Sequence, residues 1–325
     1  MKTIRWGIIG CGNVTEVKSG PGFQKAQGSE LVAVMRRDAA LAEDYARRHG
    51  VPKWYADAQA LIHDPEVDAI YIATLPVSHC AYTLAAAEAG KPVYVEKPMA
   101  LNAFEGRQMI AACQTAGAPL FVAYYRRALP RFLKAKELVT SGAIGELRFV
   151  EVLLTLPLTV HPPDQLPWRL RPEIAGGGLF VDLASHTLDF LDFVLGPVSK
   201  VSGFARNQAG AYQAEDIVSA AFEFQNGIQA VGVWCFSSFE SVDRISLVGS
   251  KGKVTLSTFD SEPVQLARPG ASQLFDLPNP PHVQQPLIQQ VVNELLGAGK
   301  CVSTGESALR TTLVMDQLLS RRDSS

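Results

Sequence analysis

The chain has 325 residues, 47% hydrophobic and 19% charged, which predicts a globular protein of two domains rather than a disordered one. Its 30 basic and 32 acidic residues give a net charge of −2 without a long basic run, which argues against nucleic-acid or anionic-membrane partners. Five scattered cysteines without a CxxC pair argue against a disulfide framework or a metal site, and favour small buried side chains.

No secretory signal or membrane-length apolar run is visible, so we expect a cytoplasmic protein. In the first part of the chain, short apolar strands alternate with helices. The predicted strands are TIRWGIIG, ELVAVMRR, AIYIAT, PVYVEK and PLFVAY, and the helices lie near residues 39–50, 60–65, 79–90 and 102–117. This alternation predicts an α/β domain at residues 1–123 with a doubly wound parallel sheet.

The first strand runs directly into the turn GCGNVT. Gly10 permits a tight turn, and Gly12 lets the backbone approach a pyrophosphate at the start of the next helix. The third position of this fingerprint is Thr15, where Gly or Ala is usual. The turn predicts a Rossmann dinucleotide-binding domain, and a plain strand-to-helix turn is the alternative.

The second strand ends at Arg36 and Arg37, followed by Asp38. A carboxylate at this place holds the ribose hydroxyls of NAD, whereas arginine accommodates the 2′-phosphate of NADP. Because arginine comes first, the sequence favours NADP. NAD stays possible because Asp38 can bend back, and paired arginines are also common in solvated turns.

The segment PVYVEKP places Glu96 and Lys97 at the carboxyl end of a parallel strand, the edge at which such sheets bind ligands. Pro98 holds Lys97 in an extended conformation, and its peptide bond can be cis or trans. A functional lysine is favoured over an ordinary surface lysine.

After about Tyr124 the pattern changes to strands, with ELRFVEVLL, KVSGFAR, DIVSAAFEF, IQAVGVWCF, RISLVG and KVTLSTF. Asn226-Gly227 and GSKG predict hairpin turns. Helices are expected near 179–195, 283–296 and 306–320, and residues 261–281 are the most loop-like. The prediction is an α+β domain at 124–325 with a large, mainly antiparallel open sheet, whose last helix can pack back on the first domain.

The run GGGLFVDLASHTLDF places a polar stripe on an otherwise apolar helix. The stripe contains Asp182, Ser185, His186, Asp189 and Asp192. It is interpreted as a substrate-facing strip with ligand room beside Gly176–Gly178, and a solvent edge is the alternative. Asp189 and Asp192 are assigned to such an edge or to a domain contact.

Together GCGNV, EKP, YYRRALP and GGGLFVDLASHTLD resemble the Gfo/Idh/MocA oxidoreductases over essentially the whole chain. The resemblance implies NAD(P) as cofactor and a homo-oligomer, dimer or tetramer, formed through the second domain's sheet. It also implies Lys97, Asp182 and His186 as catalytic residues. The expected cofactor-binding residues are Gly10, Gly12, Asn13, Val14, Arg36, Arg37, Thr74, Pro76, His79 and Glu96.

Trp168 and Arg169 resemble sugar-active members of the family. Substrate contacts are therefore expected from Lys97, Tyr124, Arg126, Trp168, Arg169, Asp182 and His186, because a guanidinium and an aromatic face suit a polyhydroxylated ring. Tyr125 stands where many members carry Asn, which leaves the substrate's identity open.

The chemistry expected is hydride transfer at a CH–OH or C=O carbon of a carbohydrate-like substrate. His186 can move the hydroxyl proton while Lys97 stabilises the alkoxide-like oxygen, and the two can exchange roles. Asp182 can orient the imidazole or hold another hydroxyl. The alternatives are an NAD-dependent inositol or sugar dehydrogenase and a catalytically silent sugar or nucleotide sensor.

Overall fold

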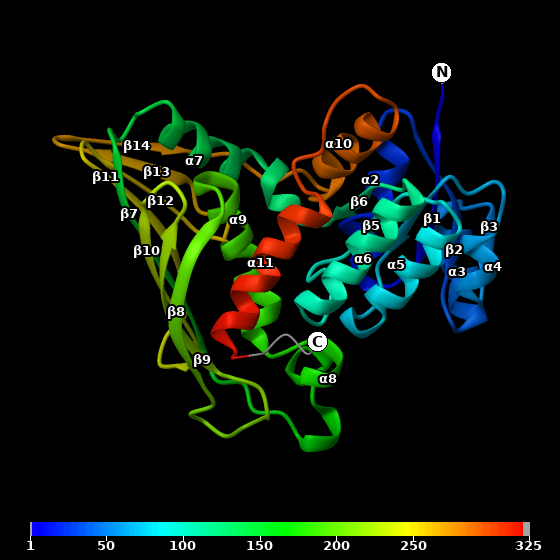
Figure 1. The fold of residues 1–325 in the computed structure, drawn as a ribbon, viewed down its shortest axis with the longest axis horizontal. Helices are drawn as coiled ribbons and strands as arrows, with labels where there is room; N and C mark the ends of the chain where they lie inside the picture. Colours follow the sequence, from blue (N-terminus) through cyan, green and yellow to red (C-terminus); the bar gives the residue numbers. More distant parts are fainter. Residues whose placement is uncertain (1, 321–325) are drawn as a thin grey trace. The chain divides into compact units, whose positions relative to one another are not determined.

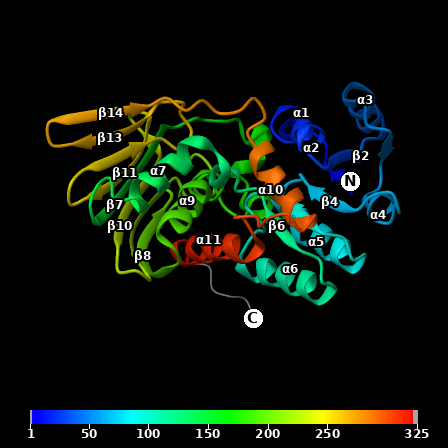
Figure 2. The ribbon, with the colours of Figure 1, turned by 90° about the horizontal axis from the view of Figure 1, so that it is seen from above.

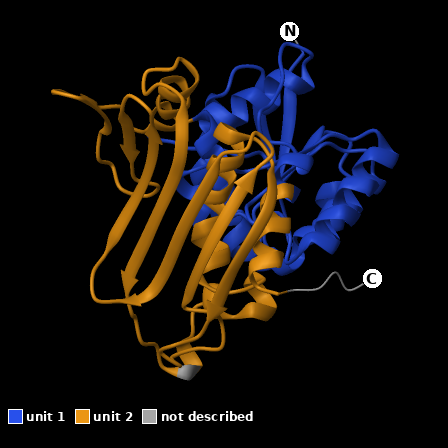
Figure 3. Ribbon diagram, turned by 60° about the vertical axis from the view of Figure 1, so that its left-hand side comes forward, with its two compact units in different colours: residues 1–128, 280–309 blue, residues 129–279, 310–325 orange. Residues whose placement is uncertain are grey.

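The computed structural model describes residues 2–320, and the chain forms two compact units (Figure 3). Unit 1 comprises Met1–Ala128 and Pro280–Leu309, and unit 2 comprises Leu129–Asn279 and Arg310–Ser325. The division differs from the expected one because the chain returns to unit 1 after the strands of unit 2. Each unit has its own sheet.

Unit 1 contains a six-stranded sheet in the order β3-β2-β1-β4-β5-β6, with every neighbouring pair parallel. Its strands are β1 (Ile4–Ile9), β2 (Ser29–Met35), β3 (Lys53–Tyr55), β4 (Ala69–Ile72), β5 (Val93–Val95) and β6 (Leu120–Val122). This order is that of the Rossmann fold, so the predicted fold class is confirmed. Among the strands of this sheet, the sequence prediction missed β3 alone, because its three residues are too few to give a periodic signal.

Helices cover both faces of this sheet (Figure 1). They are α1 (Asn13–Val17), α2 (Gly20–Lys25), α3 (Ala39–His49), α4 (Ala58–Ile62), α5 (His79–Glu88), α6 (Ala103–Ala116) and α10 (Gln285–Leu295), with 3₁₀ turns η1 (Pro76–Ser78) and η2 (Tyr125–Ala128). Figures 1 and 2 both show α10 beside α2. There Leu287 and Ile288 join Phe23, Tyr71 and Tyr94 in one core cluster. The returning segment therefore completes one face of the Rossmann sheet.

Unit 2 contains an eight-stranded sheet in the order β14-β13-β12-β11-β7-β10-β9-β8. Its strands are β7 (Leu147–Pro157), β8 (Val198–Arg206), β9 (Ile217–Phe224), β10 (Gln229–Ser238), β11 (Val242–Gly249), β12 (Lys253–Leu256), β13 (Val264–Arg268) and β14 (Ala271–Phe275). Only the β7–β10 pair is parallel among these neighbours. The expected large, mainly antiparallel sheet is confirmed.

One expectation for unit 2 was wrong. The segment expected to be loop-like, residues 261–281, contains the β13–β14 hairpin, which turns at Gly270 with φ of +72°. Pro263, Pro269 and Gly270 resembled loop residues because they flank and connect these two short strands.

The remaining helical elements of unit 2 are η3 (Pro163–Gln165), η4 (Trp168–Leu170), α7 (Pro130–Thr140), α8 (Pro172–Ala175), η5 (Phe180–Ala184) and α9 (Ser185–Leu195). Helix α11 (Gly305–Leu318) is divided, with residues up to Leu309 in unit 1 and those from Arg310 in unit 2. Across residues 2–320 no helix combines the length and apolarity needed to cross a membrane. Four of the five cysteines are buried as expected, and Cys235 is half-buried.

Candidate active site

The turn after β1 is shaped by Gly10 and Gly12. Gly10 has φ of +91°, and a Cβ there would lie 2.7 Å from Cγ2 of Thr74. A Cβ at Gly12 would meet only the carbonyl oxygen of Gly10, at 3.9 Å, so the space beside Gly12 is open. This open backbone leads into Asn13 and Val14 at the start of α1 and fits the pyrophosphate of a dinucleotide.

Thr15, the departure from the glycine fingerprint, stabilises the same turn. Its Oγ1 accepts a hydrogen bond from the Gly12 N–H at 3.0 Å and donates one to the Gly12 carbonyl at 2.8 Å. The side chain is completely buried. Threonine therefore replaces the usual small residue without disturbing the turn.

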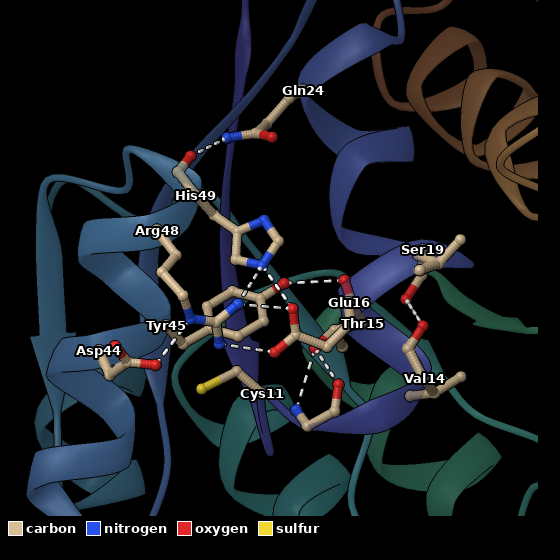
Figure 4. Close-up of polar contacts among 12 residues, drawn as sticks. Cys11, Val14, Thr15, Glu16, Ser19, Gln24, Asp44, Tyr45, Arg48 and His49 are labelled. Carbon is tan, nitrogen blue, oxygen red and sulfur yellow. Dashed lines mark hydrogen bonds and ion pairs between the residues drawn. The ribbon is translucent and has the colours of Figure 1, made fainter.

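A polar cluster anchors α1 to α3 behind this turn (Figure 4). Arg48 contacts Glu16 at 2.7 Å and Asp44 at 2.6 Å, and the ring of His49 lies 2.7 Å from Glu16. Tyr45 donates a hydrogen bond to the main-chain oxygen of Thr15 at 2.8 Å. The hydrogen bond from Arg48 lowers the pKa of Glu16 to about 2.

Arg36 and Arg37 are exposed at the end of β2. The guanidinium Nη1 of Arg36 lies 3.5 Å from the carbonyl oxygen of Cys11, so this side chain lies beside the glycine turn. Asp38 instead caps α3, where its Oδ1 accepts a hydrogen bond from the Leu41 N–H at 3.1 Å. Of these three side chains, the one that lies beside the glycine turn is thus the cationic Arg36.

The loop after β4 carries Thr74, Pro76 and His79. Pro76 is buried and opens η1, while Thr74 is half-buried and accepts a hydrogen bond from Ser78 at 2.8 Å. The ring of His79 is completely buried, with Nδ1 3.0 Å from the Pro98 oxygen and Nε2 3.1 Å from the Thr74 oxygen. Burial lowers the pKa of His79 and favours the neutral ring. His79 therefore links two loops of the chain.

Glu96 and Lys97 follow β5, as expected. Glu96 is buried, Lys97 is half-buried, and the Lys97–Pro98 peptide bond is cis. The glycine turn, the Thr74 loop and Glu96 all follow the carboxyl ends of parallel strands. The structure thus brings the nucleotide-side residues together at one edge of the unit 1 sheet.

In unit 2, the polar stripe is buried, so the alternative of a solvent edge is wrong. Its members are 0 to 7% exposed: Asp182 7%, Ser185 0%, His186 4%, Asp189 1% and Asp192 7%. Asp192 forms a two-pronged ion pair with Arg310 of α11, both contacts at 2.7 Å. Asp192 is therefore a helix-to-helix contact, and Asp189 is interior as well.

Asp182 lies in η5, a π-helical turn that leads directly into α9. Such turns are frequent at functional sites. The guanidinium Nε of Arg169 donates a hydrogen bond to Oδ2 of Asp182 at 2.8 Å, and the guanidinium lies 4.4 Å from the ring centroid of Trp168. The structure therefore brings three of the predicted substrate-side residues together.

His186 is the second residue of α9, and its ring and that of Phe259 form a T-shaped pair with centroids 5.8 Å apart. The aromatic neighbour fixes one side of the imidazole. Within residues 2–320, no group of three His, Cys, Asp or Glu side chains is arranged to hold a metal ion.

The glycines before this helix do not all leave ligand room. A Cβ at Gly178 would lie 2.7 Å from the Cβ of Ala214, and the Gly178 N–H donates to Glu215 Oε1 at 3.1 Å. Gly176 and Gly177 have φ of +75° and +153°. The run is glycine because of its backbone conformation and the close approach of residues 214–215, which corrects the expectation.

Tyr124 and Arg126 are both buried in unit 1. Tyr124 belongs to its hydrophobic core cluster, and the guanidinium of Arg126 lies 5.1 Å from the ring centroid of Tyr125. Packing thus accounts for the position of Tyr124, and a substrate contact from either residue stays a prediction.

Sequence reasoning missed two residues that contact Glu96. Tyr71 of β4 donates a hydrogen bond to its carboxylate at 2.5 Å, and Gln284 donates another at 2.6 Å. A tyrosine in the centre of an apolar strand needs a partner for its hydroxyl, which was a usable signal. Gln284 lies in no motif and is distant in sequence.

Comparisons with known proteins agree with this architecture. Residues 4–124 match the model described as "Oxidoreductase family, NAD-binding Rossmann fold", and residues 132–255 match the "GFO/IDH/MocA C-terminal domain". The chain is 40% identical to "Oxidoreductase P35" of Formosa agariphila over 96% of this chain and 97% of that protein.

Other relatives are named for their substrates. The 1,5-anhydro-D-fructose reductase of Ensifer adhaerens is 33% identical over 70% of this chain and 67% of that protein. The trans-1,2-dihydrobenzene-1,2-diol dehydrogenase of Bos taurus is 30% identical over 86% of this chain and 81% of that protein.

A solved structure, the aldose-aldose oxidoreductase of Caulobacter crescentus complexed with glycerol, superposes with a TM-score of 0.86 at 25% identity. The match covers 98% of this chain and 97% of that one. Fold, sequence similarity over nearly the full length and the matched domain models agree: this chain belongs to the Gfo/Idh/MocA family of oxidoreductases.

Proposed function

We propose that this oxidoreductase prefers NADP and acts on a CH–OH or C=O carbon of a sugar, a sugar derivative or a related polyol. The observation that carries the proposal is the placement of Lys97 directly after β5, at the ligand-binding edge of a Rossmann sheet. When bound, the dinucleotide supplies or accepts the hydride. The chain's own residues must then handle the proton and the charge on the substrate oxygen.

The cofactor preference rests on the end of β2. The guanidinium of Arg36 lies beside the glycine turn, and the Asp38 carboxylate is occupied as the cap of α3. Arginine suits a 2′-phosphate, whereas the ribose hydroxyls of NAD are usually held by a carboxylate. The cofactor-binding set is proposed to be the turn Gly10–Val14, the Arg36-Arg37 pair, the Thr74–His79 loop and Glu96.

A fluorescence titration with NADPH and NADH tests this preference. We expect NADPH to bind at least about tenfold more tightly, and we expect Arg36→Leu to remove most of that difference because it removes the charge that faces the phosphate. Arg36→Leu does not alter the glycine turn that Thr15 holds. The affinity for NADH, which has no 2′-phosphate, should therefore stay the same and serves as the internal control. Tighter binding of NADH by the wild-type protein would favour an NAD-dependent inositol-type or sugar dehydrogenase.

We assign catalysis to Lys97, Asp182 and His186. His186 can take or return the hydroxyl proton, and Lys97 can stabilise the negative substrate oxygen, with the reverse assignment as the alternative. Arg169 fixes Asp182 through the 2.8 Å hydrogen bond to Oδ2, and the role proposed for this carboxylate is to orient the imidazole or hold a substrate hydroxyl. Trp168 offers the aromatic face that suits a sugar ring.

The substrate class is supported by what the relatives are named for: an anhydro-sugar, a cyclic diol and aldoses. All of these carry hydroxyl or carbonyl groups on a carbon chain or ring. A panel of 1,5-anhydro-D-fructose, D-glucose, myo-inositol and trans-1,2-dihydrobenzene-1,2-diol, followed by absorbance of the reduced cofactor, tests it. Turnover of none of them, with intact dinucleotide binding, would favour the sensor alternative.

We also propose that the open sheet of unit 2 pairs with a second copy of the chain. One face is covered by helices, whereas the other displays Phe149 at 44%, Phe204 at 75%, Val231 at 51% and Val233 at 37% exposure. An apolar strip of this kind is typical of an oligomer interface. Light scattering after gel filtration tests the proposal: Val231→Lys should shift a wild-type oligomer to monomer, and a monomeric wild type would refute it.

A further inference from the structure

Three hydrogen-bond donors converge on the buried carboxylate of Glu96. The Tyr71 hydroxyl donates to Oε1 at 2.5 Å, and the side-chain amide of Gln284 donates to the same oxygen at 2.6 Å. The main-chain N–H of Lys97 donates to Oε2 at 3.2 Å. The carboxylate therefore connects the peptide of Lys97 to two side chains from other parts of unit 1.

The sheet explains how these groups meet. Tyr94 and Glu96 are two residues apart and so face the same side, and the ring of Tyr94 stacks on Tyr71 of the neighbouring strand with centroids 5.1 Å apart. Helix α10 covers this side, and Gln284 directly precedes it with a completely buried side chain. The returning segment of unit 1 thus brings one of the three donors to Glu96.

Both ends of the Gln284 amide are occupied. Its Nε2 donates to Glu96, and its Oε1 accepts a hydrogen bond from the Tyr94 hydroxyl at 3.1 Å. Rotating the amide by 180° would place its oxygen against the carboxylate and would remove the acceptor of the Tyr94 hydroxyl. The amide therefore has one orientation, which makes Gln284 a directional support.

The pKa of Tyr71 agrees with the hydrogen bond that its hydroxyl donates to Glu96. Burial, together with the negative charge of Glu96, raises the pKa of Tyr71 well above its usual range, so the phenol keeps the proton that it donates. The three donors match the acceptor oxygens of the Glu96 carboxylate. A buried network of this kind is rigid only while every member is satisfied.

We propose that Gln284 is a positioning residue, which acts through Glu96 to fix the backbone at Lys97. The inference rests on the proposed function, in which Lys97 is catalytic. Oε2 of Glu96 accepts the hydrogen bond from the Lys97 N–H. The two hydrogen bonds to Oε1 fix the orientation of the carboxylate and therefore the position of Oε2. Small displacements of a catalytic group have large kinetic effects, roughly 10²-fold for about 1 Å.

The first test uses the ligand-free protein. Hydrogen–deuterium exchange resolved to the Lys97 amide should be about tenfold faster in Gln284→Met than in wild type, because the Glu96 carboxylate that accepts its hydrogen bond is no longer held in orientation. The Glu96 amide, which donates to the Ile72 oxygen at 2.9 Å, is the reference within the same segment. Gln285→Met, the same substitution one residue later on a half-buried side chain, is the matched control.

The second test is kinetic, with NADPH and 1,5-anhydro-D-fructose as the first probe and the other panel members after it. Gln284→Met should lower kcat about tenfold or more while the Kd for NADPH and the KM change less than threefold, since the loss lies in the chemical step. In a Lys97→Met background the substitution should have no further effect on kcat. If Gln284→Met does not fold, Tyr94→Phe removes only the hydroxyl that orients the amide and should give the same pattern more weakly.

The outcomes separate two failures. If Lys97→Met turns over like wild type, the proposed function fails. If Lys97→Met is inactive but Gln284→Met and Tyr94→Phe match the Gln285→Met control in exchange and in kcat, only this inference is overturned. Faster exchange at Lys97 with an unchanged kcat also overturns it, because the network would then serve stability alone.

Discussion

The two units present their candidate functional residues in different ways. In unit 1, the nucleotide-side residues stand in turns after parallel strands, and the decisive features are backbone conformations such as that of Gly10. In unit 2, the residues stand on a buried helical stripe, and the decisive features are side-chain contacts such as Arg169 with Asp182. Short sequence motifs determine the geometry of a turn, whereas side-chain contacts depend on residues that the fold brings together from distant parts of the chain.

The largest effect should come from removing the proposed catalytic groups, one from each unit. Lys97→Met and His186→Ala should each lower kcat by roughly 10²- to 10⁴-fold, because each removes a group that handles proton or charge in the transition state. The Kd for NADPH should change little. Steady-state kinetics and fluorescence titration measure both quantities, with Lys251→Met and His63→Ala as controls at exposed positions. Wild-type turnover in both variants would refute the catalytic assignment.

A substitution in the glycine turn should lower the stability of unit 1. Gly10→Ala places a methyl group at φ of +91° and 2.7 Å from Thr74, so we expect the free energy of unfolding to fall by about 2–3 kcal/mol. Gly50→Ala is the control, because Gly50 has φ of +64° but no neighbour within 4 Å. It should lose about 1 kcal/mol, so equal losses in denaturant titrations would contradict the role of the Thr74 contact.

The contact between Arg169 and Asp182 tests the side-chain character of unit 2. Arg169→Leu removes the donor to Oδ2 and should lower kcat about tenfold, whereas Arg169→Lys should recover only part of it because lysine lacks the planar fork. Arg171→Leu, a half-buried neighbour, provides the control. A change in KM alone would assign Arg169 to substrate binding rather than to orientation of the carboxylate.

The smallest effect concerns the cluster that anchors α1 to α3. The hydrogen bond from Arg48 lowers the pKa of Glu16 from 4.5 to about 2, so Glu16 stabilises the fold above pH 4.5 and loses this contribution as the pH falls toward 2. The side chain of Glu16 is 34% exposed, so the contribution is at most about 1 kcal/mol. Denaturant titrations should show Glu16→Gln less stable than wild type at pH 7 and the difference vanishing near pH 2. A difference that persists there would locate the effect in packing.

Much of the fold could be predicted because its signals are local. The alternation of strands and helices, the glycine turn and the Asn226-Gly227 hairpin each involve residues close in sequence. The β13–β14 hairpin was missed because its strands are short and lie next to proline and glycine. Local signals also overstated the ligand room at Gly178, since the residues that approach it, 214–215, follow a long intervening segment.

The candidate site divides in the same way. Lys97, Asp182 and His186 could be singled out from motif and stripe. Gln284 could not, because its contact with Glu96 joins residues that are 188 positions apart. Asp192 was assigned to a solvent edge or to a domain contact, and the solvent edge is wrong for the same reason, since its partner Arg310 lies 118 positions further along the chain.

The return of Pro280–Leu309 to unit 1 has a consequence for biosynthesis. A nascent chain leaves the ribosome from its N-terminus, so the first Rossmann strands emerge long before Leu287 and Ile288, which cover Phe23 and Tyr71. Until translation is nearly complete, this apolar surface lacks the residues that bury it in the folded protein, and chaperones can bind to it. Truncated products that stop before residue 280 should therefore aggregate, even though they contain every strand of the N-terminal sheet.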